Sequence, residues 1–88
     1  MDYKLKRIIG KGASGTVFKA VHKSSGKKYA IKCIKNPFQT FNVAKKVLRE
    51  IQIMRQLTQM EGNVHTTKLY DVMHTEDFSH IFLVMDYV

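Results

Sequence analysis

The stretch "IIGKGASGTVFKA", residues 8–20, spaces three glycines as Gly10-x-Gly12-x-x-Gly15. Dinucleotide-binding folds carry this spacing where a strand leads into a helix, and an acidic residue follows about twenty positions later. In this chain the letters TVF after the last glycine are β-branched or aromatic and predict a second strand. The next acidic residue is Glu50, more than thirty positions on. The spacing therefore does not mark a dinucleotide fold.

Two interpretations of the glycine stretch remain open. A Walker A loop is excluded, because no Gly-Lys-Ser/Thr ends the motif. In one interpretation the strand–turn–strand is a flexible lid. Its glycines let the backbone approach a phosphate, its N–H groups point at the anion, and Val17 places an apolar side chain over a flat base. In the other interpretation it is a glycine-rich hairpin without a ligand.

The rest of the pattern predicts an α+β fold, a five-stranded antiparallel sheet with one packed helix. Segments rich in β-branched and aromatic residues predict strands at 3–9, 16–22, 29–35, 68–74 and 80–88. Apolar residues at spacings of three and four predict a helix with a stripe formed by Val43, Val47, Leu48, Ile51, Met54 and Leu57. Thr40 or Asn42 is expected to cap its start. The segment from Gly10 to Gly15 is expected to be a turn.

Composition limits the class of protein. The 88 residues suit one small domain. Cys33 is the single cysteine, so no intrachain disulfide can form, which favours a reducing, intracellular setting. No apolar run is long enough to span a bilayer. The net charge is +8, and no acidic residue lies between Tyr3 and Arg49. A basic first half suits anionic ligands, or is a solvated face balanced by charge elsewhere in the protein.

A lysine in an apolar strand and a glutamate on the helix form a second signal. Lys32 lies within "YAIKCI", where an unpaired ammonium is costly to bury. Period two puts Ala30 on the same face, and so small a side chain leaves room for a base. Glu50 lies beside the apolar stripe, and an ion pair with it would orient the Lys32 ammonium toward phosphates. Alternatively, Glu50 is a solvated helix residue with Lys46 one turn before it.

In this order "GKGASGTV", "YAIK" and "REI" on a helix resemble the N-terminal lobe of eukaryotic protein kinases, over essentially the whole chain. The resemblance implies that the glycine stretch covers ATP and that Lys32 holds its α and β phosphates while paired with Glu50, these two being the expected catalytic residues. It also implies a nucleotide site made of Ile9, Gly10, Lys11, Gly12, Ala13, Ser14, Gly15, Val17, Ala30, Lys32, Met85, Asp86 and Val88.

The resemblance also implies a role for several positions of that site. Val17 and Ala30 would cap the adenine ring, and Met85 would take the gatekeeper position behind it. The backbone carbonyl of Asp86 and the backbone N–H of Val88 would bond the edge of the base.

The segment "NPFQTFNVAKKVLREIQIMRQL" is similar to mitogen-activated protein kinases, which implies a serine/threonine kinase that uses ATP and Mg²⁺ on protein substrates. By the same resemblance, residues 1–88 are the N-terminal lobe of an incomplete kinase domain and end inside the hinge after the fifth strand. The catalytic-loop Asp and Asn and the metal-binding Asp-Phe-Gly would lie beyond it. We therefore expect no metal ligand in this chain and no phosphoryl transfer by the chain alone.

Two other functions compete with this interpretation. A pseudokinase or regulatory lobe would bind a partner through the helix face, although intact Lys32 and Glu50 argue against a degenerate site. A small basic nucleic-acid binder would need aromatic side chains arranged as a stacking platform on one sheet face. The aromatic residues of this sequence have no such pattern. We expect neither nucleic acid nor a membrane among its partners.

Overall fold

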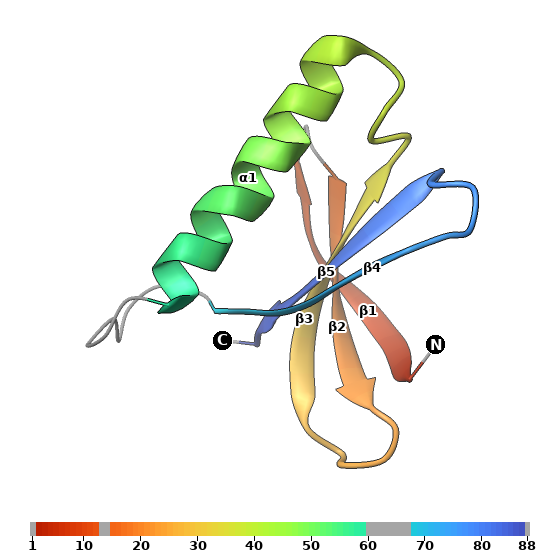
Figure 1. Cartoon of the computed structure of the whole chain (residues 1–88). Helices are drawn as coiled ribbons and strands as arrows, with labels where there is room; N and C mark the ends of the chain where they lie inside the picture. The colour runs from red at the N-terminus through yellow and green to blue at the C-terminus, as the bar shows by residue number, and fades with distance from the viewer. Residues whose placement is uncertain (1, 13–14, 60–67, 88) are drawn as a thin grey trace.

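The computed structural model describes residues 2–12, 15–59 and 68–87. They form one sheet and one helix that lies across it (Figure 1). In chain order the elements are β1 (Tyr3–Gly12), β2 (Gly15–His22), β3 (Lys28–Lys35), α1 (Phe41–Gln59), β4 (Leu69–His74) and β5 (His80–Asp86). The predicted fold class, a five-stranded antiparallel sheet with one helix, is confirmed. None of the described helical residues makes a segment long and apolar enough to cross a membrane.

The strand order is β1-β2-β3-β5-β4, with every neighbouring pair antiparallel. β1, β2 and β3 are consecutive neighbours, whereas β5 lies between β3 and β4. The register sets Val17 opposite Lys32 and Ala30 opposite Met85. Because directly opposed residues of antiparallel strands share a face, these four side chains lie on one side of the sheet.

The glycine stretch corrects one expectation. β1 continues through Gly12, although the segment from Gly10 onward was predicted to be a turn. Gly10 pairs with Val17 and Gly12 with Gly15, so both glycines belong to the β1–β2 ladder. A register shift between Ile8 and Gly10 leaves Ile9 as a bulge, and the pairing of β1 with β2 continues beyond it.

α1 begins where predicted and buries a narrower stripe than predicted. The Val43 N–H donates to Thr40 Oγ1 at 3.1 Å, so Thr40 is the cap. Val47 is buried against the sheet, with Ile51 and Met54 packed beside it. Val43 and Leu48 are exposed, contrary to prediction. The stripe is narrow because one face of a single helix meets one face of the sheet. The side chain of Leu57 lies outside the described part of the chain.

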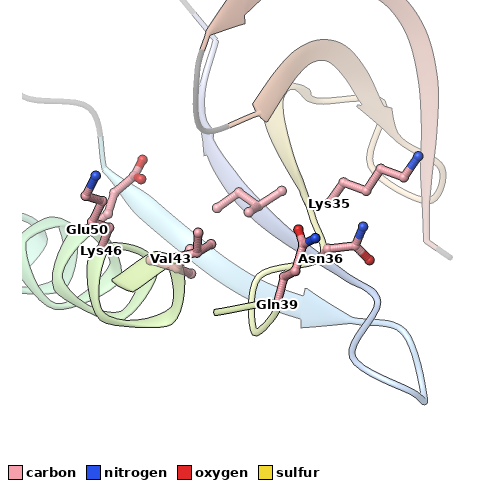
Figure 2. A pocket seen from close by; sticks show the side chains of 8 residues that line it. Lys35, Asn36, Gln39, Val43, Lys46 and Glu50 are labelled. Carbon is pink, nitrogen blue, oxygen red and sulfur yellow. The ribbon is translucent and has the colours of Figure 1, made fainter. Parts of the chain in front are cut away.

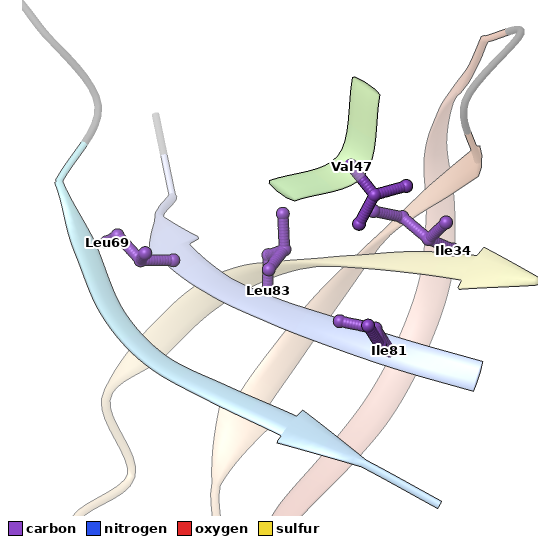
Figure 3. Close-up of a cluster of buried hydrophobic side chains, with 5 residues drawn as sticks. All are labelled: Ile34, Val47, Leu69, Ile81 and Leu83. Atoms are coloured by element: carbon purple, nitrogen blue, oxygen red, sulfur yellow. The ribbon is translucent and has the colours of Figure 1, made fainter. Parts of the chain in front are cut away.

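The core has two layers, one on each side of the sheet. Under α1, Figure 3 shows a cluster formed by Ile34, Val47, Leu69, Ile81 and Leu83. On the opposite side a smaller cluster forms from Ala20, Ile31 and Val84. Burying a Val, Leu or Ile side chain contributes about 1.5–3 kcal/mol. The helix-side cluster, which draws residues from β3, β4 and β5, therefore fixes α1 against the sheet, where it can present Glu50.

Candidate functional site

An ion pair joins the sheet to the helix. Lys32 Nζ donates to Glu50 Oε1 at 2.6 Å. The side chains of Lys32 and Glu50 are only 17% and 30% exposed. Among the described residues, no other hydrogen bond or ion pair is made by either side chain, so each charge depends on the other. The alternative in which Glu50 is merely solvated is wrong.

Local sequence explains why the pair forms. Lys32 shares its sheet face with Ile34, two residues on, and Ile34 packs under Val47 of α1. Glu50 follows Val47 by three residues, so both lie on nearly the same side of the helix. The apolar contact of Ile34 with Val47 thus sets the distance at which the ammonium meets the carboxylate.

The glycines of the site differ in what they are needed for. A Cβ at Gly15 would lie 2.3 Å from the Cys33 carbonyl oxygen, so the fold itself requires glycine there. A Cβ at Gly12 would meet nothing within 4 Å. Gly10 and Gly12 are also not among the described glycines with positive φ. Packing therefore accounts for Gly15, while Gly12 keeps an open backbone that a phosphate can approach.

The register brings part of the predicted nucleotide set together. Gly10, Val17, Ala30 and Met85 fall on the face that carries Lys32. Two predicted members have side chains on the opposite face. Lys11 is paired with Thr16, which lies opposite Cys33, and Asp86 is paired with Tyr29. Only the backbone of these two residues is available to the Lys32 side.

Of the four other predicted members, only Ile9 lies among the described residues. Ile9 lies in the β1 bulge and is exposed. Ala13, Ser14 and Val88 lie outside the described residues.

Positive charge lines the same face beyond Lys32. Arg7 lies opposite Lys19, and Lys19 lies opposite Ala30. The Lys19 ammonium is 5.3 Å from the centre of the Tyr87 ring. A hydrogen bond with Arg7, helped by the charges of Lys19 and Lys28, lowers the pKa of the Tyr87 phenol. This basic row is suited to anions, and sequence reasoning missed it, although alternation in "YKLKR" and "VFKAV" was the available signal.

A cavity of about 330 Å³ adjoins the ion pair on the side of the helix start (Figure 2). Its walls come from α1 and from the end of β3 with the loop that follows, and are formed by Ile34, Lys35, Asn36, Gln39, Val43, Lys46, Val47 and Glu50. Neither Val17 nor Ala30 lines it, so this cavity is separate from the face predicted for the base. Across the described residues, no cluster of three or more His, Cys, Asp or Glu could hold a metal ion.

Comparison with known proteins gives a consistent result. The family model described as "Protein kinase domain" matches residues 3–88. Mitogen-activated protein kinase 2 of Pneumocystis carinii is 34% identical over 85 residues, covering 97% of this chain and 24% of that protein. Mitogen-activated protein kinase 15 of Rattus norvegicus is 34% identical over 84 residues, covering 96% of this chain and 15% of that protein.

A third relative is similar over a shorter stretch. Mitogen-activated protein kinase 8 of Oryza sativa subsp. japonica is 44% identical over 55 residues, covering 62% of this chain and 10% of that protein. The chain therefore spans about a quarter or less of the length of these relatives.

Proposed function

The chain belongs to the protein kinase domain family, and on that premise we propose that residues 1–88 are the ATP-binding lobe of a serine/threonine kinase of the mitogen-activated type. The reaction of the whole protein would be transfer of a phosphoryl group from ATP to a serine or threonine of a protein substrate. The observation that carries the proposal is the Lys32–Glu50 ion pair beside an open glycine strand.

The residues of this chain would have three tasks. The backbone around Gly10 and Gly12 would approach the phosphates, because no side chain of either glycine stands in the way. Lys32, held by Glu50, would bind the α and β phosphates as a fixed point charge. Val17 and Ala30 would cover the base. ATP supplies the phosphoryl group, and its Mg²⁺ ligands would come from residues beyond this chain.

Binding can be tested by titrating ATP into the ¹⁵N-labelled chain while its amide shifts are followed by NMR. With one side of the cleft only, we expect a Kd of about a millimolar or weaker, corresponding to about 4 kcal/mol. Shifts should concentrate at Gly10, Val17 and Ala30. Replacing Lys32 with Ala removes a charge-assisted bond and should weaken binding about tenfold. Lys35→Ala, at the exposed end of the same strand, is the matched control.

Three outcomes of this titration contradict the proposal: no binding, shifts elsewhere, or equal loss in both lysine variants. A separate assay addresses catalysis. The purified chain should incorporate no phosphate from ATP into a protein substrate, and ATP-dependent incorporation would overturn the expected inactivity of the lobe alone.

The alternative is a regulatory lobe that binds a partner without catalysis. One observation favours it: α1 leaves large apolar side chains exposed, among them Phe41 at 81%. The reading frame after residue 88 separates the two, because only a kinase needs the catalytic-loop Asp and the Asp-Phe-Gly motif.

A further inference from the structure

The side chain of Asp86 ties the end of β5 to the start of β4. Tyr70 Oη donates to Asp86 Oδ1 at 2.5 Å, and the Lys68 N–H donates to Asp86 Oδ2 at 3.2 Å. The Asp86 N–H in turn donates to the Lys68 carbonyl at 3.3 Å. Both carboxylate oxygens and the backbone of Asp86 are therefore held at the last residue of the strand.

A bulge explains how Tyr70 reaches Asp86. Leu69 pairs with Met85 and Asp71 with Val84, so Tyr70 is left without a partner in the β4–β5 ladder. Because a bulge redirects a side chain, Tyr70 can turn to the face on which Asp86 lies beside Tyr29. The Tyr70 and Tyr29 rings meet edge to face, with centroids 5.3 Å apart.

The Tyr70 ring is in turn the end of an aromatic row. Tyr29 meets Tyr3 at 5.7 Å, and Tyr3 meets His22 at 5.1 Å between ring centroids. Ala20 is fully buried between the strands of Tyr3 and Tyr29, and its small side chain leaves the space that the rings fill. The row crosses from β2 and β1 to β4, so the position of the Tyr70 hydroxyl is fixed by the sheet as a whole.

We propose that Tyr70 is a positioning residue that makes the nucleotide site prefer adenine over guanine. The inference rests on the proposed function and on the part that the resemblance implies for Asp86, whose backbone carbonyl would accept a hydrogen bond from the purine. Adenine offers an amine at that position, whereas guanine offers a carbonyl oxygen, which repels another acceptor. A carbonyl that cannot turn rejects guanine. Tyr70, by anchoring the Asp86 side chain, would keep the backbone of this residue from turning.

The hydroxyl of Tyr70 is the group to remove. Tyr70→Phe deletes the bond to Asp86 and keeps the ring on Tyr29. Tyr29→Phe is the matched control, since it deletes a hydroxyl from the same aromatic row that makes no hydrogen bond among the described residues. ATP and GTP are titrated separately into each ¹⁵N-labelled chain by NMR, at equal Mg²⁺, and the ratio of the two Kd values is compared.

The expected result is an ATP-over-GTP preference in the wild-type chain that falls about threefold or more in Tyr70→Phe and stays unchanged in Tyr29→Phe. Asp86→Asn, which keeps one acceptor oxygen and loses the other, should give an intermediate ratio. The Asp86 amide should also exchange faster with solvent in Tyr70→Phe. A general loss of stability lowers both affinities alike and leaves the ratio unchanged.

The outcomes separate the two proposals. If the wild-type chain prefers ATP and the Tyr70→Phe ratio equals it, the positioning role is overturned and the nucleotide site stands. Should Tyr29→Phe lower the ratio as much as Tyr70→Phe, the row acts only as packing and the role of the hydroxyl is likewise overturned. If the wild-type chain binds neither nucleotide, the proposed function fails and this inference with it.

Discussion

Removing the Glu50 charge should destabilise the whole fold by an amount that its surroundings set. Pairs at the protein surface contribute about 0–1 kcal/mol, whereas breaking a buried pair costs about 3–5 kcal/mol. Lys32 and Glu50, at 17% and 30% exposed, fall between these limits. We therefore expect Glu50→Gln to lower the free energy of unfolding by about 1–2 kcal/mol.

The assay is urea unfolding followed by circular dichroism. For a chain of this size an m-value of about 1 kcal/mol/M converts the loss into a midpoint lowered by about 1–2 M. Arg49→Gln changes the exposed neighbour of Glu50 on the same helix and should shift the free energy of unfolding by no more than about 0.5 kcal/mol.

A double-mutant cycle isolates the interaction itself. The cycle combines Glu50→Gln with Lys32→Met, which keeps most of the length of the side chain and removes its charge. We expect a coupling energy of about 1 kcal/mol, because each single change leaves the other charge half-buried without its partner. A coupling below about 0.3 kcal/mol would refute the reasoning, since the two charges would then be independent although they lie 2.6 Å apart.

Three other experiments test the fold and the chemistry of its side chains. Gly15→Ala should lower the free energy of unfolding by about 1–3 kcal/mol, because its Cβ meets a carbonyl oxygen of β3, while Gly12→Ala has open space and should cost nothing; equal urea midpoints would contradict this. Val47→Ala should cost about 2 kcal/mol and the exposed Val43→Ala less than about 0.5, so similar losses in thermal unfolding would show that the stripe is misplaced. Burial raises the pKa of the Cys33 thiol above 9.0, so iodoacetamide at about pH 8 should alkylate the folded chain more slowly than the urea-unfolded chain. Because the pKa of Cys33 is raised by folding, its contribution to the free energy of unfolding is fully present below the unfolded-state pKa and is lost as the pH rises through the folded-state pKa. Faster alkylation of the folded chain would exclude the shift.

Much of the fold could be predicted because it depends on local periodicity. Alternation in the strands and spacings of three and four in the helix follow from backbone geometry alone. The Lys32–Glu50 contact could be predicted as well, since a lysine in an apolar strand needs a partner and few acids were available. The glycine strand was harder, because glycine propensity favours a turn while the neighbouring strand supplies the backbone with hydrogen bonds.

The Asp86 anchor could not be predicted from the sequence. It requires a bulge at Tyr70, and a bulge depends on the register between β4 and β5 rather than on any residue in them. The exposure of Leu48 was equally hidden, because the width of a helix stripe is decided by how much of the sheet lies beneath it. Both features depend on tertiary packing, which the periodicity of the sequence does not determine.

The strand order has a consequence for how the polypeptide is made. β1, β2 and β3 can pair as soon as they leave the ribosome, but the free edge of β3 waits for β5, which is the last of these five strands to be synthesised. Throughout that interval the nascent chain offers an unpaired row of amides next to the apolar residues Ile31 and Ile34. Slowing translation between residues 36 and 79 should therefore increase aggregation of the newborn chain, and a chaperone that covers this edge should reduce it.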